Sequence, residues 1–128
     1  QLRAVLEGLA ARLAVPLFSP DELDEIDRNL SAAEAALEKG DLIQCSQHGK
    51  KLHDAIISKA NNQQLLLIIH NLDDHVQRFR LISDQINGRL HKSVKEHRSV
   101  LEALRQKDPQ AAEEAMRAHL HSVLEDLS

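Results

Sequence analysis

Two histidines stand symmetrically about the clearest break in the second half of the sequence. His97 lies 11 residues before Asp108, and His119 lies 11 residues after it. Asp108-Pro109 is typical of a helix start, with a capping residue followed by proline at the first helical position. Two helices folded back at this point would each rise ~1.5 Å per residue, so both imidazoles would lie about 16 Å from the turn. The spacing therefore predicts that the two rings face each other.

The apolar residues around each histidine place both rings on inward faces. The inward series on the two helices are Val94, His97, Leu101 and Leu104, and Ala112, Met116, His119 and Val123. A third histidine, His53, follows Leu52 on a face that also carries Leu42, Cys45, Gly49, Ile56 and Ala60. Neutral imidazole binds zinc, nickel, copper, cobalt and iron(II). Three inward histidines from three helices predict a metal site; the alternative is three hydrogen-bonded core residues.

Further polar residues are candidates for binding a ligand beside this site. His75 continues the apolar series through Ile68 and Leu72, so it is a reserve metal ligand or a polar group in the pocket. Arg78 lies 10 residues before Gly88 and His97 lies 9 after it, so Arg78 is expected level with the histidines. An arginine there suits a carboxylate ligand, although an exposed or salt-bridged arginine is the alternative. Arg80 is a weaker candidate.

Composition and charge exclude several classes of function. The net charge of −4 and the absence of a basic stripe argue against a nucleic-acid surface in these 128 residues. Cys45 is the only cysteine, which predicts a reduced, cytoplasmic protein with a core thiol. The longest apolar run, LLLII at 65–69, is too short to cross a membrane. There is no catalytic triad order, glycine-rich phosphate loop or carboxylate pair, so we expect no enzyme.

Apolar residues recur at helical spacing along almost the whole chain. This periodicity predicts an all-α, antiparallel bundle of about six helices in one domain, 1–128. Ser19-Pro20 and Asp41 are expected to cap two of the helix starts. The first helix is expected to bury Leu2, Val5, Leu6, Leu9 and Leu13. The predicted helices cover 2–15, 20–39, 42–60, 63–86, 90–107 and 109–128.

Three stretches resemble one known family, the FCD (FadR C-terminal) domain of GntR-family bacterial transcription regulators. LRAVLEGLAARLAV (2–15) is similar to its opening R-x-x-x-E helix, with Arg3 and Glu7 at the matching places. LHDAIISKANNQQL (52–65) is similar to its second motif, with His53 and Asn62. EHRSVLEALRQKDPQAAEEAMRAHL (96–120) is similar to its long closing motif. The resemblance covers essentially the whole chain.

The resemblance implies a helical bundle that binds a small metabolite, often an organic or sugar acid. Many members hold a divalent metal with three histidines and one aspartate; the histidines carry over to His53, His97 and His119, and we expect zinc or nickel. The aspartate would fall at residue 49, which is Gly49 here, and Leu52 replaces the usual phenylalanine. Water, the carboxylate of the effector or His75 would fill the gap, and binding without metal stays open. We also expect Asn62, with Arg78, His75 and Arg80, close to the effector.

The family also places a winged-helix DNA-binding domain before this one. Nothing here resembles that domain, and the sequence opens on Gln1 rather than methionine, so we expect the effector half of a longer protein. The whole protein would bind operator DNA as a homodimer, without contact to a membrane. Two alternatives remain: a metal-dependent enzyme on a helical bundle, and a ligand-free structural bundle.

Overall fold

A computed structural model describes residues 2–72, 78 and 81–127 of the chain. All regular secondary structure in these residues is helical, which confirms the predicted all-α class. Among the described residues, no helix combines the length and the apolar character that crossing a membrane requires. The elements are α1 (Leu2–Ala14), η1 (Val15–Leu17), α2 (Pro20–Glu38), α3 (Leu42–Lys59), α4 (Gln63–Asn71), α6 (Arg89–Arg105) and α7 (Pro109–Leu127).

The helix starts form where the sequence places capping residues. At the start of α2, Ser19 Oγ accepts from Glu22 N at 3.2 Å, and Glu22 Oε1 accepts from Ser19 N at 2.9 Å. Asp41 accepts from Gln44 N at 3.1 Å at the start of α3. Asp108 accepts from Ala111 N at 3.1 Å at the start of α7. Each cap satisfies amide groups that have no partner within the helix, so these boundaries follow from local chemistry.

The single helix predicted over 63–86 is wrong. α4 ends at Asn71, with Leu72 as its C-cap. A separate helical segment occupies 81–84, and a turn over 85–88 follows, in which Gly88 has a φ of +80°. The prediction relied on one inward apolar series that included Ile68 and Ile82, whereas Ile68 is 46% exposed and Ile82 is 55% exposed. The helical spacing of apolar residues over 63–86 therefore does not correspond to one continuous buried face.

The predicted inward face of the first helix is also wrong. Leu2 and Val5 are exposed, whereas small residues fill the buried face of α1, and Leu6, Leu9 and Leu13 only flank the core. A Cβ at Gly8 would lie 2.6 Å from the Arg117 side chain on α7, so the two helices approach closely there. The buried face of α1 consists of Ala4, Glu7, Gly8, Ala10, Ala11 and Ala14. This close packing brings Glu7 into the interior.

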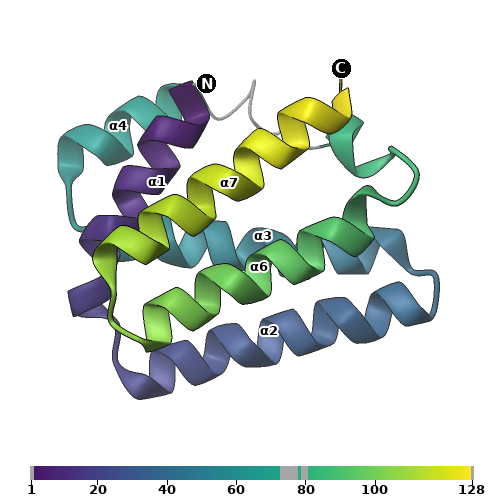
Figure 1. Ribbon diagram of the computed structural model, residues 1–128, viewed down its shortest axis with the longest axis horizontal. Helices are drawn as coiled ribbons and strands as arrows, with labels where there is room; N and C mark the ends of the chain where they lie inside the picture. The colour runs from purple at the N-terminus through teal and green to yellow at the C-terminus, as the bar shows by residue number, and fades with distance from the viewer. Residues whose placement is uncertain (1, 73–77, 79–80, 128) are drawn as a thin grey trace.

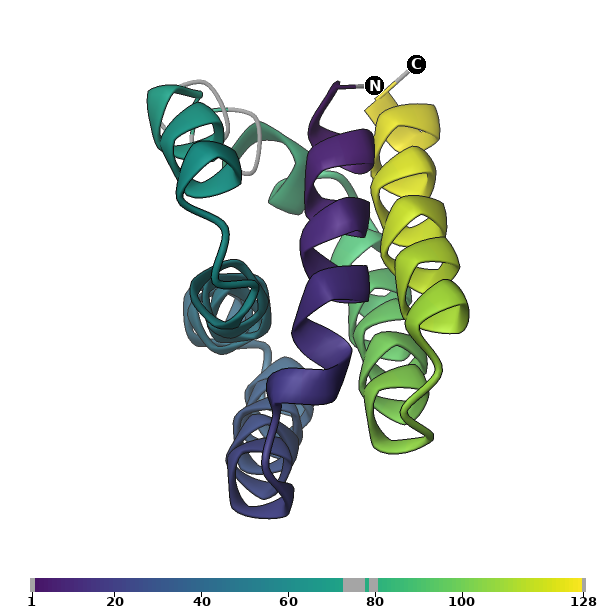
Figure 2. The same ribbon diagram turned by 90° about the vertical axis from the view of Figure 1, so that its left-hand side faces the viewer.

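The helices surround a main aliphatic core, and Ala33, Cys45 and Leu90 form a second, smaller buried cluster. α1 and α7 lie side by side and run in opposite directions, as do α2 and α6, while α3 passes behind them (Figures 1 and 2). α4 lies beside the first turns of α1 (Figure 2). Leu104, Met116 and Val100 are fully buried between these layers. The predicted inward residue Leu42 on α3 is an exception, since it is 50% exposed at the helix start.

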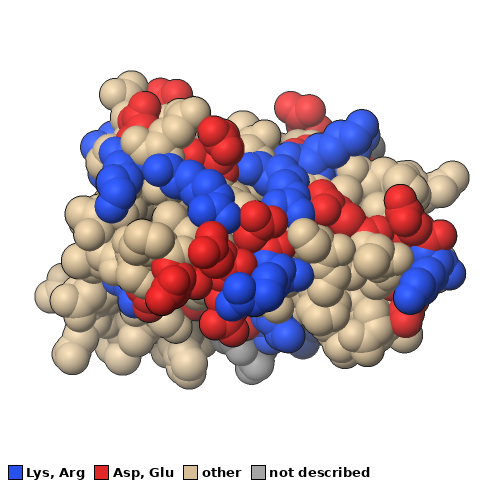
Figure 3. Space-filling model, turned by 90° about the horizontal axis from the view of Figure 1, so that it is seen from below, with Lys and Arg blue, Asp and Glu red and all other residues tan. Residues whose placement is uncertain are grey.

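Ion pairs join α2 to α6 on the outside of the bundle. Arg98 on α6 binds Asp27 at 2.5 Å and Glu34 at 2.8 Å, both on α2. Exposed pairs of this kind contribute little to stability, about 0–1 kcal/mol each. Acidic and basic side chains alternate over this face without a large area of one sign (Figure 3). This face therefore lacks the basic patch that binding to nucleic acid requires.

Candidate metal centre

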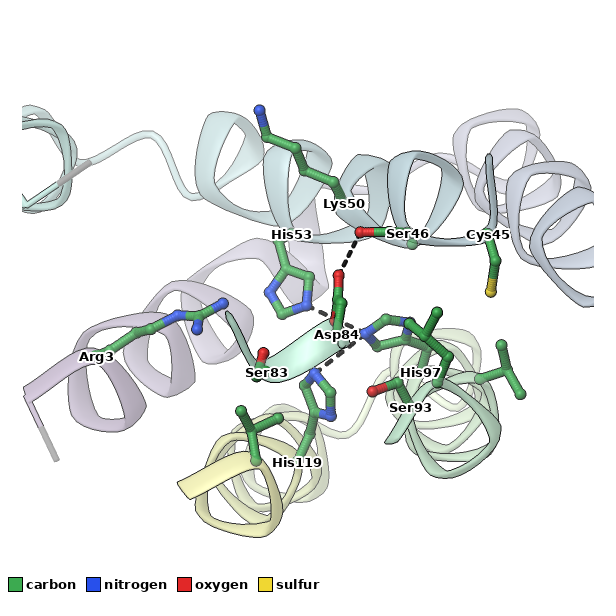
Figure 4. A pocket seen from close by; sticks show the side chains of 14 residues that line it. Arg3, Cys45, Ser46, Lys50, His53, Ser83, Asp84, Ser93, His97 and His119 are labelled. Atoms are coloured by element: carbon green, nitrogen blue, oxygen red, sulfur yellow. Dashed lines mark hydrogen bonds between the residues drawn. The ribbon is translucent and has the colours of Figure 1, made fainter. Parts of the chain in front are cut away.

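Three imidazoles from three helices meet in the interior. His53 on α3, His97 on α6 and His119 on α7 are each at least 93% buried. Their Nε2 atoms face one another, at 3.2 Å between His53 and His97 and 3.1 Å between His97 and His119 (Figure 4). The prediction that His97 and His119 lie level on facing helices is confirmed.

The spacing of these nitrogens fits a bound metal ion. Two nitrogens at ~2.05 Å from a tetrahedral zinc ion are separated by about 3.3 Å, close to the distances seen here. One ligand atom from each of the three histidines lies within 4.8 Å of the others. Carboxylates bind Nδ1, the ring nitrogen on the far side from the other rings, in His53 and His119. The donor set therefore suits a divalent metal that binds imidazole.

Glu7 on α1 holds the ring of His53. Its Oε1 lies 2.6 Å from His53 Nδ1, and its Oε2 accepts from Arg3 Nε at 2.7 Å. Burial alone would raise the pKa of Glu7, but the charge and hydrogen bond of His53, with help from Arg3, hold that pKa well below its usual value. An ionised carboxylate only accepts hydrogen bonds, so Nδ1 of His53 carries the proton. When the ring is neutral, its Nε2 then carries the lone pair toward the other rings.

Glu96 on α6 does the same for His119. Its Oε1 lies 2.6 Å from His119 Nδ1, and the same oxygen binds Arg89, whose side chain is completely buried. Burial alone would raise the pKa of Glu96, but hydrogen bonds from His119 and Ser122 and the charge of Arg89 lower it. Arg89 also binds Asp126 at 2.8 Å near the end of α7. A continuous network thus runs from Arg3 through the three rings to Arg89.

Carboxylates behind metal-binding histidines are a recurrent arrangement. They fix which ring nitrogen is protonated, orient the ring and increase its basicity toward the metal. Here both outer rings, His53 and His119, have such a partner, and each partner is held by an arginine. The Nε2 atoms of these two rings are thereby directed toward His97 before any ion binds.

A cavity of about 30 Å³ opens beside the rings. It has room for a metal ion or a few water molecules, but not for a sugar acid. Basic side chains from two helices, Arg3 and Lys50, contribute to its wall, and Gly49 lies where the family resemblance expects an aspartate. Asp84, from the helical segment 81–84, lies on the opposite side (Figure 4).

Of the residues predicted beside the effector, the two that the structure describes, Asn62 and Arg78, do not line this cavity. Asn62 is exposed, and its side chain accepts from Leu65 N at 3.0 Å, where it caps α4. Arg78 is exposed. Its predicted place level with His97 assumed one continuous helix from 63 to 86, whereas α4 ends at Asn71. His75 and Arg80 lie outside the described residues. An effector role for these four stays a prediction.

Sequence reasoning missed the charged residues that complete the site. Glu7 and Arg3 appeared only as matches to a family motif, and Glu96 only as the neighbour of His97. A signal for Glu7 was present, since it lies among the small residues of α1 at helical spacing, Ala4, Glu7, Ala11 and Ala14. A charged residue in a line of alanines indicates a buried ion with a partner.

Cys45 is the core thiol that the sequence predicted. It is buried and forms no disulfide. Burial raises the pKa of its thiol, and the charges of Asp84 and Glu34 raise it further. Only the thiolate is a strong nucleophile, so Cys45 is a poor candidate for catalysis.

Comparisons with known proteins identify the family of this chain and several relatives. The FCD domain family matches residues 1–122. A Bacillus subtilis protein described as an uncharacterised HTH-type transcriptional regulator, YdhC, is 24% identical over 99% of this chain and 57% of its own length. The Glc operon transcriptional activator of Escherichia coli K12 is 28% identical over 98% of this chain and 52% of its own. The HTH-type transcriptional repressor RspR of the same strain is 25% identical over 98% and 55%.

A solved structure shows the same fold. Streptococcus agalactiae GntR superposes with a TM-score of 0.72 at 24% identity, over 95% of this chain and 54% of that one. The chain thus spans about half the length of the relatives that it matches. These relatives are transcription regulators by name, which places the chain with regulatory domains rather than with metal-dependent enzymes. The chain belongs to the FCD family, the effector-binding domains of GntR-type transcription regulators.

Proposed function

We propose that this domain senses a small carboxylate metabolite through a divalent metal held by His53, His97 and His119. The observation that carries the proposal is the convergence of three Nε2 atoms, two of them on rings whose Nδ1 is bound by a carboxylate. Zinc and nickel both accept imidazole ligands. A bound ion would supply a Lewis-acidic position to which an effector carboxylate can bind.

The charges around the cavity favour an anionic effector. Arg3 and Lys50 both line the cavity, although the Lys50 ammonium is directed away from the three imidazoles in Figure 4. Figure 4 shows the Arg3 side chain directed toward His53 and Ser83. Arginine binds carboxylates through paired N–H groups, and lysine adds a point charge. A small organic or sugar acid is therefore the class of ligand that this wall suits best.

The size of the cavity supports a regulatory role. A metabolite does not fit within about 30 Å³, so we expect its binding to displace side chains or elements that line the cavity. These elements are α1, α3, the segment 81–84, α6 and α7. Ligand binding that favours a displaced arrangement shifts the population of the whole bundle toward it.

Regulation of DNA binding would be the output of this movement. The relatives are named as HTH-type regulators, and this chain matches about half of each. In the full-length protein, the moving bundle would change the relative placement of two DNA-binding heads in a homodimer, and with it the affinity for an operator with two half-sites. The direction of the effect, repression or activation, follows from that geometry.

Elemental analysis of the purified domain tests the metal directly. We expect near-stoichiometric zinc or nickel in the parent and none in a His97→Ala, His119→Ala double variant. The matched control is His70→Ala, His91→Ala, which removes two exposed histidines from α4 and α6. An equal metal content in the parent and in the His97, His119 variant would contradict the proposed site, as would a parent that binds no metal after reconstitution.

Effector binding is tested next, on the metal-loaded domain. Thermal unfolding would be followed across a panel of small carboxylic acids and matched neutral alcohols. A ligand at 100 times its dissociation constant stabilises the folded state by about 2.7 kcal/mol. We expect a carboxylate to raise the melting temperature of the parent and not of an Arg3→Gln variant. Stabilisation by the neutral alcohols alone would contradict an anionic effector.

A further inference from the structure

The residues of α3 that line the cavity carry no carboxylate. The ring of His97 lies close to the position that a side chain at residue 49 would occupy. A Cβ built on Gly49 would lie 3.0 Å from His97 Cε1 and 3.4 Å from His97 Nδ1. A side chain at residue 49 would therefore require the ring to shift by a few tenths of an ångström. The aspartate that the family resemblance expects there is replaced by direct packing of imidazole against the helix.

A different carboxylate faces the same cavity from another element. Asp84 belongs to the helical segment 81–84 and is half-buried in the cavity wall. Figure 4 shows its carboxylate directed toward α3, where Ser46 Oγ donates to Asp84 Oδ2, and its oxygens lie outside the group of three histidine atoms that are within 4.8 Å of one another. Ser46 lies three residues before Gly49, one turn earlier on α3. Asp84 thus brings an anionic group to α3 within one helical turn of the missing aspartate.

The other two carboxylates near the rings are already engaged. Glu7 binds His53 Nδ1 and Arg3, and Glu96 binds His119 Nδ1 and Arg89. Both bind the outer ring nitrogens and so stand behind the rings, not at the point where the three Nε2 atoms meet. Among the described residues that line the cavity, Asp84 is the acidic residue on the open side.

We propose that Asp84 supplies, in place of residue 49, the carboxylate of this metal centre. The inference rests on the proposed metal-binding function and adds a ligand that neither the sequence motifs nor the family resemblance assigns. The Asp84 carboxylate would exchange its hydrogen bond to Ser46 for the metal or for a water molecule bound to it. A divalent charge buried among three neutral imidazoles is unfavourable without a nearby anion, and Asp84 provides one.

Replacing Asp84 by asparagine tests the proposal. Asparagine keeps the shape and still accepts from Ser46, but it removes the negative charge. We expect Asp84→Asn to weaken zinc and nickel binding by about 10- to 100-fold, the range that supporting groups of metal sites commonly show. Affinities would be measured by competition with a chelator of known affinity. The melting temperature of the metal-free variant would show that the fold is intact.

Two further variants separate the charge from the packing. Ser46→Ala removes the hydrogen-bond partner and leaves the carboxylate, so its metal affinity should stay within about threefold of the parent. In the Asp84→Asn background, Gly49→Asp restores a carboxylate, whereas Gly49→Ala adds the same Cβ without charge. We expect recovery of metal affinity with aspartate and none with alanine, and a matching change in the visible absorption of the cobalt(II)-substituted protein.

The outcomes distinguish this inference from the function on which it rests. Equal metal affinity in the parent and in Asp84→Asn would overturn the role of Asp84 and leave the histidine site standing. Equal losses in Ser46→Ala and Asp84→Asn would also overturn it, because the hydrogen bond rather than the charge would then matter. Unchanged metal binding in the His97→Ala, His119→Ala variant would overturn the metal centre itself, and this inference with it.

Discussion

Replacing Glu7 by glutamine should weaken metal binding from behind the ring of His53. Glu7 is 97% buried and binds His53 Nδ1 at 2.6 Å and Arg3 Nε at 2.7 Å. Glutamine has one oxygen and one amide group, so it can accept from only one of these donors and turns N–H groups toward the other. The change removes the anion that orients His53 and leaves Arg3 facing a poorer partner.

The size of the effect follows from the same contacts. Loss of such a supporting carboxylate weakens metal binding by about 10- to 100-fold, which corresponds to about 1.4–2.7 kcal/mol. Breaking a fully buried ion pair costs about 3–5 kcal/mol of folding stability. The Arg3 side chain is 17% exposed, so water partly compensates Arg3 for the lost carboxylate. We therefore expect Glu7→Gln to lower the unfolding free energy by about 2–3 kcal/mol.

The loss of stability should depend on pH in a defined direction. Glu7 has a lower pKa in the folded protein than in the unfolded chain. Its contribution to stability is therefore present above about pH 4.3, the ordinary value for glutamate, and is lost as the pH falls further. The difference in unfolding free energy between parent and Glu7→Gln should be largest near neutral pH and should shrink below about pH 4.

Urea unfolding of the metal-free proteins between pH 3 and 7, and chelator competition at pH 7, provide the measurements. The matched control is Glu113→Gln, which removes an equivalent charge that pairs with Arg12 and Arg117 at the α1–α7 contact. We expect less than about 1 kcal/mol and unchanged metal affinity in that control. If Glu7→Gln bound zinc as tightly as the parent and unfolded at the same urea concentration, the reasoning from buried contacts would be refuted.

A buried arginine, a core methionine and the glycine beside His97 each give a further measurable outcome. Arg89→Leu should lower the unfolding free energy by about 3–5 kcal/mol in urea at pH 7, because Glu96 and Asp126 lose a buried partner. Met116 is fully buried, so Met116→Ala should cost about 2–5 kcal/mol and lower the melting temperature in calorimetry. Gly49→Ala should weaken metal binding in chelator competition, because its Cβ displaces the His97 ring. The higher helix propensity of alanine should stabilise the metal-free protein in urea by up to about 1 kcal/mol. Unchanged metal affinity would contradict the contact between residue 49 and His97.

The parts of the fold that sequence could predict are those fixed by local chemistry. The start of α2 at Ser19-Pro20 and the start of α7 at Asp108-Pro109 depend on capping residues and proline, which act within one turn. The facing of His97 and His119 followed from two helical periods and one turn. These inferences needed no knowledge of what lies across the bundle.

The errors arose where long-range packing decides. The face of α1 was misjudged because leucines usually mark the core, whereas α1 approaches α7 through alanine and Gly8 and leaves Leu2 exposed. The continuous helix from 63 to 86 was misjudged because exposed and buried leucines look alike in a sequence. The place of Asp84 in the cavity wall could not be predicted either, because it depends on the turn that separates its segment from α6.

The pairing of each buried glutamate with its own arginine has a consequence for the total charge of the interior. Glu7 with Arg3 and Glu96 with Arg89 cancel, so the three imidazoles begin from a neutral surrounding. A divalent ion with Asp84 beside it would leave an excess of one positive charge in a largely buried space. One monocarboxylate would restore neutrality. On this count the ion and the acid each favour the binding of the other. A doubly charged acid would need a second cation, and Lys50 could supply it only by turning its side chain toward the cavity that it lines.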